Sequence, residues 1–527
     1  MSASDKKKLR AAERAEKMTE KQQVEQKEAK KLKLMTTIFV VILAVMICFA
    51  AVTAVTKTIE NSGIREKKTV AVTIGEHEIS NAELNYYYIN SINTFYNQYG
   101  SYIALFGLDV TKPLNEQYVN EEAGTTWADD FIASAVSSAQ SVYALNDAAA
   151  AAGFTLTESQ QATIDAEITN LDLYALYYGY TKGEDYLRAM YGSAASVESY
   201  RNYVEMLTIA DAYQNAYYEG LTYEDADLRE AEADNYNAYS SYTYNYYYMS
   251  TSKFEDAAAA EAAAKELSAA NINTVEALNA AIAGLSINAD VEGAASYENK
   301  DILNGSISSI YAEWVTDPAR KAGDVKYFES TTTSTDENGN EITDVTGYYV
   351  VMFQSVNDNN FPLVNVRHIL AAFEGGTYDS TTGLTTYSED EKIAAKAEAQ
   401  ALYNEWKNGA ATEESFAALA NEKSDDGDGT TGGLYEDIYP GQMVSEFNNW
   451  CFDSARKPGD TDMVETTYGY HVMYFSGNSD VTYRDFMIES ELKNNALNEW
   501  YNGLIEATST TMGNTKYLNT ALVLSAN

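Results

Sequence analysis

An internal duplication constrains the fold of this chain more than any other feature of its sequence. The pattern W-x-x-D-x-A-R-K-x-G-D in Trp314–Asp324 recurs in Trp450–Asp460, at an offset of 136 residues throughout. Further along, Gly347–Val350 (GYYV) matches Gly469–Val472 (GYHV) at an offset of 122 residues. Because two patterns recur in the same order, the sequence indicates two copies of a unit of about 120 residues.

The two offsets differ by 14 residues (136 − 122), so the first copy carries an insertion between the two patterns. We place this insertion in Thr331–Thr346, where Asn338-Gly339 predicts a tight hairpin turn. The first copy is then expected over residues 235–356 and the second copy over residues 362–477.

Each copy reads as a mixture of strands and helices. In the second copy, hydrophobic periodicity predicts five elements. They are a strand at Leu363–Phe373, helices at Glu391–Gly409, Glu414–Asn421 and Val444–Phe452, and a closing strand at Tyr470–Phe475. This mixed order is typical of an α+β fold, with helices packed on a small antiparallel sheet.

The segment before the duplication reads as mainly helical. Val70–Gly75 predicts a short strand, and capping boxes at Ser80 and Thr157 predict the starts of two helices. Helical patterns continue to about Gly220, which indicates one all-helical domain over residues 70–222. A last helical stretch, Asp480–Thr508, has too few apolar residues for a separate domain, so we expect it to dock on the earlier helices.

A run of 23 residues without a charge, Leu34–Thr56, is long enough to cross a bilayer. Residues 1–33 carry 11 Lys and Arg against 6 Asp and Glu, so the positive-inside rule predicts a cytoplasmic N-terminus and an extracytoplasmic remainder. The alternative is a cleaved signal peptide with small residues at Val52 and Ala54, but signal peptides have apolar regions of roughly 7–15 residues. Cys48 lacks the small preceding residue of a lipoprotein site. We therefore expect a retained single-pass anchor in the cell membrane.

The charge is strongly asymmetric along the chain. The net charge is −42 and the first 33 residues sum to +5 (11 − 6), which leaves about −47 (−42 − 5) for the rest. Such a surface repels nucleic acid and favours solubility, so no nucleic-acid partner is expected. Only Cys48 and Cys451 occur, and Cys48 lies in the apolar run, so no disulfide between folded domains is expected.

Two of the three histidines of the chain fall in the second copy. His368 lies in the expected first strand and His471 in the expected closing strand. Between them stand three further motifs, Ser424–Asp426 (SDD), Gly432–Leu434 (GGL) and Gly441–Phe447 (GQMVSEF). These two histidines and three motifs are the candidate functional residues of the second copy.

Each of these residues also has an ordinary structural explanation. A single histidine near a strand end more often makes a structural hydrogen bond, and Met443 and Phe447, spaced i and i+4, are typical of a helix core. A metal site of two histidines and one aspartate is chemically conceivable, but no ligand spacing supports it. Thr430 and Thr431 also break the calcium-loop pattern after Asp425. No metal and no cofactor are expected.

In this order, the two histidines and the three motifs between them resemble the motifs of parvulin (PpiC-type) peptidyl-prolyl isomerases, over residues 362–477. The layout of the chain also resembles that of the PrsA/SurA-type extracytoplasmic foldases, which place a helical chaperone domain before their isomerase modules. The resemblance to this N-terminal domain rests on Val72–Tyr88 and the helical pattern alone.

The resemblance implies an apolar proline cup, meaning the side chains that receive the proline ring, and polar groups around the rotating carbonyl. It places Leu434, Met443 and Phe447 in the proline cup, the paired His368 and His471 at the base of the sheet, and either Asp425 or Asp426 beside the rotating bond. Tyr468 is expected to bind substrate, at a position where some relatives carry Ser or Thr. The two histidines would hold each other in a hydrogen-bonded network. The sequence leaves the choice between the two aspartates open.

The first copy departs from these motifs. Tyr349 stands where the second copy has His471, and Tyr246 or Tyr247 stands where it has His368. Asn304–Tyr311 replaces the GQM-x-x-x-F motif, so we expect a parvulin-like fold that has lost its activity. In chain order, the expected segments are a basic cytoplasmic segment (1–33), a membrane helix (34–56), a helical SurA/PrsA-like domain (70–222), a degenerate parvulin-like domain (235–356), an active isomerase domain (362–477) and a C-terminal helical segment (480–527).

The resemblance implies a peptidyl-prolyl isomerase and folding chaperone that acts on unfolded or partly folded secreted polypeptides with X-Pro bonds. The loop Glu374–Glu391 contains no Lys or Arg, which argues against recognition of phosphorylated substrates. One rival hypothesis is a holdase that uses both parvulin folds only to bind clients, and another is a structural envelope protein. The motifs in the second copy favour catalysis, although a fold alone does not imply a function.

Overall fold

The computed structural model describes residues 63–524, apart from residues 270, 337–338, 380–381, 428 and 523, together with Lys6, Lys7 and Arg10. The expected membrane helix at residues 34–56 lies outside the described residues. Among the helices of the described part, none combines the length and apolarity that crossing a membrane requires. The described chain divides into two compact units, one comprising residues 223–492 and the other residues 63–222 and 493–524.

The second of these units is mainly helical, as expected. Its elements are α2 (Ile64–Lys68), β1 (Val70–Ile74), β2 (His77–Ser80), α3 (Asn81–Tyr99), β3 (Tyr118–Asn120), β4 (Thr125–Thr126), α4 (Trp127–Ala151), α5 (Glu158–Thr169), α6 (Leu171–Tyr177), α7 (Gly183–Tyr191), α8 (Val197–Gly220), the C-terminal part of α16 (Tyr483–Ala507) and β15 (Thr510–Met512). The capping boxes predicted at Ser80 and Thr157 are both present, and they begin α3 and α5.

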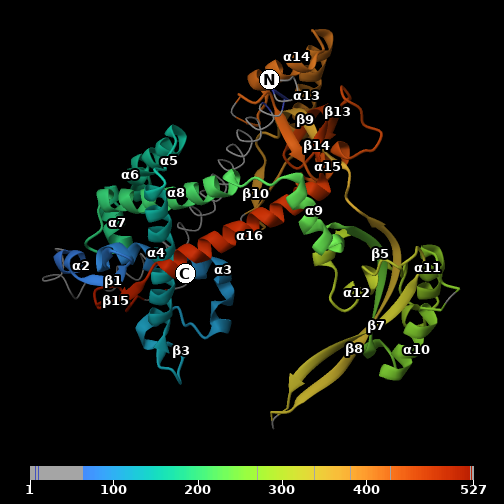
Figure 1. The fold of residues 1–527 in the computed structure, drawn as a ribbon, viewed down its shortest axis with the longest axis horizontal. Helices are drawn as coiled ribbons and strands as arrows, with labels where there is room; N and C mark the ends of the chain where they lie inside the picture. The colour runs from blue at the N-terminus through green and yellow to red at the C-terminus, as the bar shows by residue number, and fades with distance from the viewer. Residues whose placement is uncertain are drawn as a thin grey trace. The chain divides into compact units, whose positions relative to one another are not determined.

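The C-terminal segment returns to this helical unit, which confirms the expected docking. The Trp500 ring stacks on the Tyr217 ring of α8, with centroids 4.0 Å apart. Strand β15 pairs antiparallel with β1, so the small sheet has the order β15-β1-β2 (Figure 1). The sequence analysis did not anticipate this sheet, because β15 and β2 are only three and four residues long.

The unit of residues 223–492 contains the two copies, each built on one four-stranded antiparallel sheet. After α9 (Asp225–Asp234), the first copy consists of β5 (Ser241–Ser250), α10 (Ala257–Leu267), α11 (Val275–Ala283), β6 (Tyr297–Leu303), α12 (Ala312–Val315), β7 (Val325–Thr335) and β8 (Glu341–Asn357). The second copy consists of β9 (Pro362–Ala372), β10 (Thr377–Asp379), β11 (Leu384–Thr386), α13 (Glu389–Asn408), α14 (Glu413–Lys423), β12 (Leu434–Ile438), α15 (Ser445–Cys451), β13 (Thr461–Glu465) and β14 (Gly469–Thr482).

The duplication predicted from the sequence is confirmed by topology and by local geometry. The strand orders are equivalent, β6-β5-β8-β7 in the first copy and β12-β9-β14-β13 in the second. Asp301 and Asp437, 136 residues apart, share a backbone φ of 52°, which non-glycine residues rarely adopt. The predicted insertion lengthens the β7–β8 hairpin, which extends beyond its sheet (Figure 1).

The sheet of the second copy has two differently covered faces. Side chains at Ile369, Ala371 and Val472 face a core that α13 and α14 complete. Val366 and Met473 belong to the core on the opposite face, which α15 covers. Since side chains alternate along a strand, His368 and His471 fall on the α15 face.

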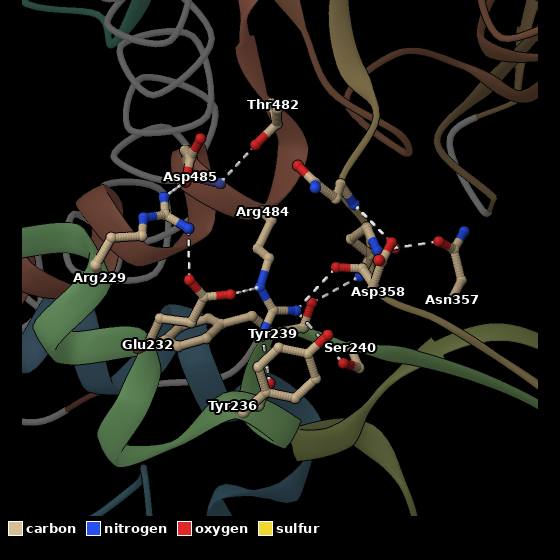
Figure 2. Close-up of polar contacts among 12 residues, drawn as sticks. Arg229, Glu232, Tyr236, Tyr239, Ser240, Asn357, Asp358, Thr482, Arg484 and Asp485 are labelled. Atoms are coloured by element: carbon tan, nitrogen blue, oxygen red, sulfur yellow. Dashed lines mark hydrogen bonds and ion pairs between the residues drawn. The ribbon is translucent and has the colours of Figure 1, made fainter. Parts of the chain in front are cut away.

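A buried arginine at the start of α16 ties three segments of this unit together. The Arg484 side chain is 3% exposed; it pairs with Glu232 of α9 and donates to the backbone oxygens of Tyr236 (2.7 Å) and Asp358 (2.8 Å). Its guanidinium also lies 4.0 Å from the centre of the Tyr236 ring. Figure 2 shows Arg484 between Glu232 on one side and Asp358, in the linker between the copies, on the other.

Candidate active site

His368 and His471 come together because their strands are neighbours in the sheet. In the β9–β14 pairing, His368 lies opposite Met473 and His471 lies opposite Leu370, so the two histidines are diagonal neighbours on one face. Their Nδ1 atoms are 3.0 Å apart, and their exposed fractions are 3% and 6%. The histidine pair expected from the resemblance is therefore present in the structure.

Of the two candidate aspartates, Asp426 contacts the histidine pair. Its Oδ2 atom lies 3.0 Å from His368 Nε2. Asp425 is bound elsewhere, since its backbone N–H donates to Leu370 O (3.0 Å) and its Oδ2 accepts from Ala372 N (2.8 Å). The geometry thus separates the two residues: Asp425 ties the loop to the end of β9, and this turns Asp426 toward His368.

Thr466 completes the network at its other end, and the sequence analysis missed it. Its Oγ1 lies 2.9 Å from His471 Nε2 and accepts from the backbone N–H of Tyr468 (3.1 Å). The side chain of Tyr468 is 62% exposed, so this residue contributes its backbone to the network while its ring faces solvent. Thr466 follows β13 in a turn, a position that gives no sequence signal of its own.

The contacts join these side chains into one continuous polar chain. His368 Nε2 faces the Asp426 carboxylate, the two Nδ1 atoms share one hydrogen bond, and His471 Nε2 faces the Thr466 hydroxyl. In the shared bond one imidazole ring donates and the other accepts. Burial, the largest cause, and the neighbouring His368 together lower the pKa of His471 to about 3, against the opposing effect of Asp426. His471 is therefore neutral at physiological pH.

The apolar part of the site lies beside the histidines. The Phe447 ring of α15 is buried, and its centroid lies 5.4 Å from each histidine ring centroid, edge-on in both cases. Met443 and Tyr435 pack, partly buried, against the same core. Met443 and Phe447 thus lie where the resemblance places the proline cup.

Leu434, unlike Met443 and Phe447, does not lie on the face of the sheet that carries the histidines. In the β12–β9 pairing, Leu434 is opposite Arg367 and Tyr435 is opposite Val366. Paired residues share a face, so Leu434 lies on the α13–α14 side and Tyr435 on the histidine side. The Tyr435 ring centroid is 5.0 Å from that of His368 and 6.5 Å from that of Phe447. Tyr435, and not Leu434, therefore lies beside His368 and Phe447.

The glycine pair before β12 allows this strand to approach His368. Gly433 adopts φ +65°, and a Cβ at this position would lie 2.1 Å from the carbonyl oxygen of His368. The Gly433 carbonyl in turn accepts from the backbone N–H of His368 (2.9 Å). A side chain at this position would separate the strands at the histidine, which explains the glycine.

The first copy has the same framework with tyrosines at the histidine positions. Tyr246 lies opposite Val351, as His368 lies opposite Met473, and both pairs are related by the 122-residue offset. The register therefore selects Tyr246 over Tyr247 as the counterpart of His368. Tyr246 and Tyr349 have ring centroids 6.1 Å apart, so the first copy has phenol rings where the second has its imidazole pair.

No group of three or more His, Cys, Asp and Glu side chains is arranged to hold a metal ion within the part of the chain that the structure describes. The site thus consists of a hydrogen-bonded chain of protein side chains beside an apolar cup. Its groups suit binding and orientation of a peptide more than covalent chemistry.

Comparisons with known proteins agree with the motifs. Residues 348–478 match the family model described as the PPIC-type PPIASE domain. The foldase protein PrsA of Exiguobacterium sibiricum is 30% identical over 100 residues, which cover 19% of this chain and 31% of that protein. The chain thus matches about a third of the length of this curated relative. The resemblance of the second copy to parvulin-type isomerases is confirmed.

Solved structures of PrsA proteins are also similar to parts of the chain. The crystal structure of PrsA from Bacillus subtilis is 14% identical, covers 72% of this chain and 85% of its own, and has a TM-score of 0.27. The peptidylprolyl isomerase PrsA from Bacillus anthracis is 21% identical, with coverages of 28% and 59% and a TM-score of 0.18.

Proposed function

We propose that this chain catalyses cis–trans isomerisation of X-Pro peptide bonds, since residues 348–478 match the model of the PPIC-type PPIASE domain. The observation that carries the proposal is the shared face of one sheet. On it, the proline cup (Met443, Phe447 and, from the structure, Tyr435) adjoins the His368–His471 pair. The Asp426 carboxylate contacts the same pair.

The chemistry requires little from the protein. Rotation about the peptide bond has a barrier of about 18–20 kcal/mol because it breaks amide resonance. A catalyst lowers this barrier by binding the twisted state better than either planar state. An apolar cup that fixes the proline ring, with polar groups around the moving carbonyl, meets this requirement without transferring a proton.

We assign the side chains the following roles. Met443 and Phe447 hold the proline ring, and Asp426 is the polar group beside the rotating bond. His368 and His471 form a scaffold that keeps Asp426 and the cup in register, because their ring nitrogens contact each other, Asp426 and Thr466. Tyr468, exposed at the edge of the site, is available to contact the substrate chain.

A protease-coupled assay with a chromogenic X-Pro peptide tests the proposal on the purified chain. Without a catalyst, the cis isomer converts over tens to hundreds of seconds. We expect the chain to shorten this phase in proportion to its concentration. If the isomerisation rate equals the spontaneous rate while circular dichroism shows a folded protein, the isomerase proposal is wrong and the holdase hypothesis replaces it.

We further propose that the first copy is catalytically silent and that the helical segment 70–222 binds clients. The rival is a holdase in which both copies only bind polypeptides. Suppression of aggregation of a proline-free client separates the two activities, since a pure holdase would show that effect and no isomerisation. The division into segments at residues 70–222, 235–356, 362–477 and 480–527 follows the same proposal.

We also propose that the chain is anchored by residues 34–56 and acts outside the cytoplasm on secreted polypeptides with X-Pro bonds. The support is the uncharged run and the basic segment before it. Protease added to intact cells should remove most of the protein and spare a small N-terminal fragment. A mature chain that begins just after Ala54 would contradict the anchor.

A further inference from the structure

Tyr435 makes a second contact that its place in the cup does not require. Its ring lines the cup beside His368 and Phe447. Its hydroxyl donates to Asp426 Oδ2 over 2.8 Å. One side chain therefore forms an apolar wall of the site and also binds the acidic group of the site.

Two donors to Asp426, from His368 and Tyr435, converge on the same oxygen. Asp426 Oδ2 lies 3.0 Å from His368 Nε2 and 2.8 Å from the Tyr435 hydroxyl. Hydrogen bonds to an ionised acceptor are roughly twice as strong as those between neutral groups. This oxygen is consequently held from the strand that carries His368 and from the strand that carries Tyr435.

The hydrogen bond from Tyr435 to Asp426 matters because the loop that follows Asp426 is rich in glycine. Glycines at 427, 429, 432 and 433 all adopt positive φ, between 65° and 94°. The ties of Asp425 to β9 direct the backbone before Asp426, while the glycines after it carry no side chain that could hold the Asp426 carboxylate in place. The Tyr435 hydroxyl, on the ordered strand β12, supplies a fixed point within hydrogen-bonding distance.

The first copy provides an internal contrast at the same position. Asn299 corresponds to Tyr435 at the 136-residue offset, and it lies opposite Tyr244 as Tyr435 lies opposite Val366. The Asn299 amide donates to the Tyr244 hydroxyl (2.8 Å) and not to a carboxylate. The tyrosine–carboxylate–histidine arrangement thus belongs to the copy that carries the imidazole pair.

We propose that Tyr435 is a positioning residue of the isomerase, whose hydroxyl fixes the Asp426 carboxylate against His368 Nε2. This inference rests on the proposed function, because it assigns a role within that reaction. Its effect falls on kcat more than on KM, since the ring that contacts the proline is separate from the hydroxyl that holds Asp426.

The first experiment compares Tyr435→Phe with Tyr470→Phe in the full chain. Tyr470 is a matched control, because its hydroxyl also donates to a carboxylate of the second copy, Glu465 (2.6 Å), but on the α13–α14 face. A hydrogen bond to a charged group contributes enough to predict a loss of kcat of roughly tenfold in Tyr435→Phe. We expect an unchanged KM in that variant and unchanged kinetics in Tyr470→Phe. Equal effects of the two substitutions would overturn the proposal.

A double-mutant cycle with Asp426→Asn tests whether the hydroxyl acts through Asp426. If it does, Tyr435→Phe costs less than twofold in kcat once Asp426 is replaced, because interacting residues are not additive. The same tenfold loss in both backgrounds would show that Tyr435 acts by another route and would refute the positioning role.

A spectroscopic readout separates this proposal from the proposed function. The chain has three histidines, so imidazole nitrogen-15 signals can be assigned with single His→Gln variants. We expect Tyr435→Phe to shift the His368 Nε2 signal and Tyr470→Phe to leave it in place. An inactive wild-type chain that shows this shift would refute the isomerase and retain the positioning contact. An active wild-type chain in which Tyr435→Phe does not shift the His368 signal would support the isomerase and refute the positioning contact.

Discussion

The Nδ1 atoms of His368 and His471 lie 3.0 Å apart, and the other ring nitrogen of each is also bound, to Asp426 and Thr466 respectively. All four imidazole nitrogens are therefore engaged inside the protein. A histidine that exchanged protons with substrate would have to break one of these buried contacts. These contacts favour the proposed scaffold role of the two histidines, and the next predictions give the pH dependence expected from that role.

We predict that the free energy of unfolding of the second copy rises with pH between about 3 and 6.5, in part because of His471. The folded-state pKa of His471 is lowered to about 3, against an ordinary value near 6.5, so the unfolded chain binds more protons in this window. The full stabilisation is present above pH 6.5 and is lost as pH falls toward 3. The contribution is on the order of a few kcal/mol.

Denaturant unfolding of the wild type and of His471→Gln across this window measures the effect. Glutamine retains hydrogen bonding but does not titrate, so the difference between the two proteins should shrink as pH falls. A difference that stays constant from pH 7 to pH 4 would contradict the depressed pKa.

We predict an isomerisation rate that is flat between pH 5.5 and pH 7.5. Amide rotation needs no net proton transfer, and His471 stays neutral throughout this range. The measurement is kcat/KM against pH, with the folded fraction followed by circular dichroism. A step that follows a pKa near 6.5 in a folded protein would make one histidine an acid–base catalyst.

The proline cup should act through its shape and apolarity. Met443→Ala should reduce activity by at least tenfold with little loss of stability, because Met443 is only partly buried. Phe447→Ala should reduce both, since Phe447 is 3% exposed and large-to-small changes in a core typically cost about 2–5 kcal/mol. Isomerisation assays and thermal unfolding of both variants distinguish these outcomes. Wild-type activity in folded Met443→Ala would remove Met443 from the cup.

A matched pair of substitutions in the first copy tests whether this copy lacks isomerase activity. Ile307 and Tyr311 stand 136 residues before Met443 and Phe447, and both are buried. We expect Ile307→Ala with Tyr311→Ala to leave the isomerisation rate unchanged, while the equivalent double change in the second copy abolishes it. If the double variant of Met443 and Phe447 kept half of the wild-type isomerisation rate, the first copy would be active.

Sequence reasoning found the parts of the site that depend on residue type and order. His368, His471, Met443 and Phe447 were identified from the resemblance, and the structure brings all four onto one face. The sequence reasoning did not separate Asp425 from Asp426, because the two residues are adjacent. The hydrogen bonds of Asp425 to the backbone of β9 decide which carboxylate turns toward His368.

The remaining errors come from strand pairing, which sequence periodicity does not encode. Leu434 was assigned to the cup, but a shift of one residue along β12 moves a side chain to the other face, and the pairing selects Tyr435. Strands β12 and β13 were not predicted because each has five residues, with acidic side chains among them. The same pairing information was needed to choose Tyr246 over Tyr247.

Arg484 should be a main contributor to the stability of residues 223–492. Its side chain is 3% exposed, so Arg484→Met removes the buried partner of Glu232 and the donor to the backbone oxygens of Tyr236 and Asp358. Breaking a buried pair from one side typically costs about 3–5 kcal/mol. Arg229→Met is the control, because Arg229 also pairs with Glu232 but is 42% exposed, and such pairs contribute about 0–1 kcal/mol. Similar losses in the two variants by urea unfolding would contradict this difference.

The pairing of β1 with β15 has a consequence for the time at which the protein matures. The helical unit takes its first strand from residues 70–74 and its last from residues 510–512, so both copies are inserted between its two parts. During synthesis or export from the N-terminus, residues 223–492 emerge before this sheet can close. The client-binding segment proposed here is thus completed last, after the isomerase module has had its whole sequence available for folding. An unfinished chain would present an open edge at β1, and release of the final residues closes it.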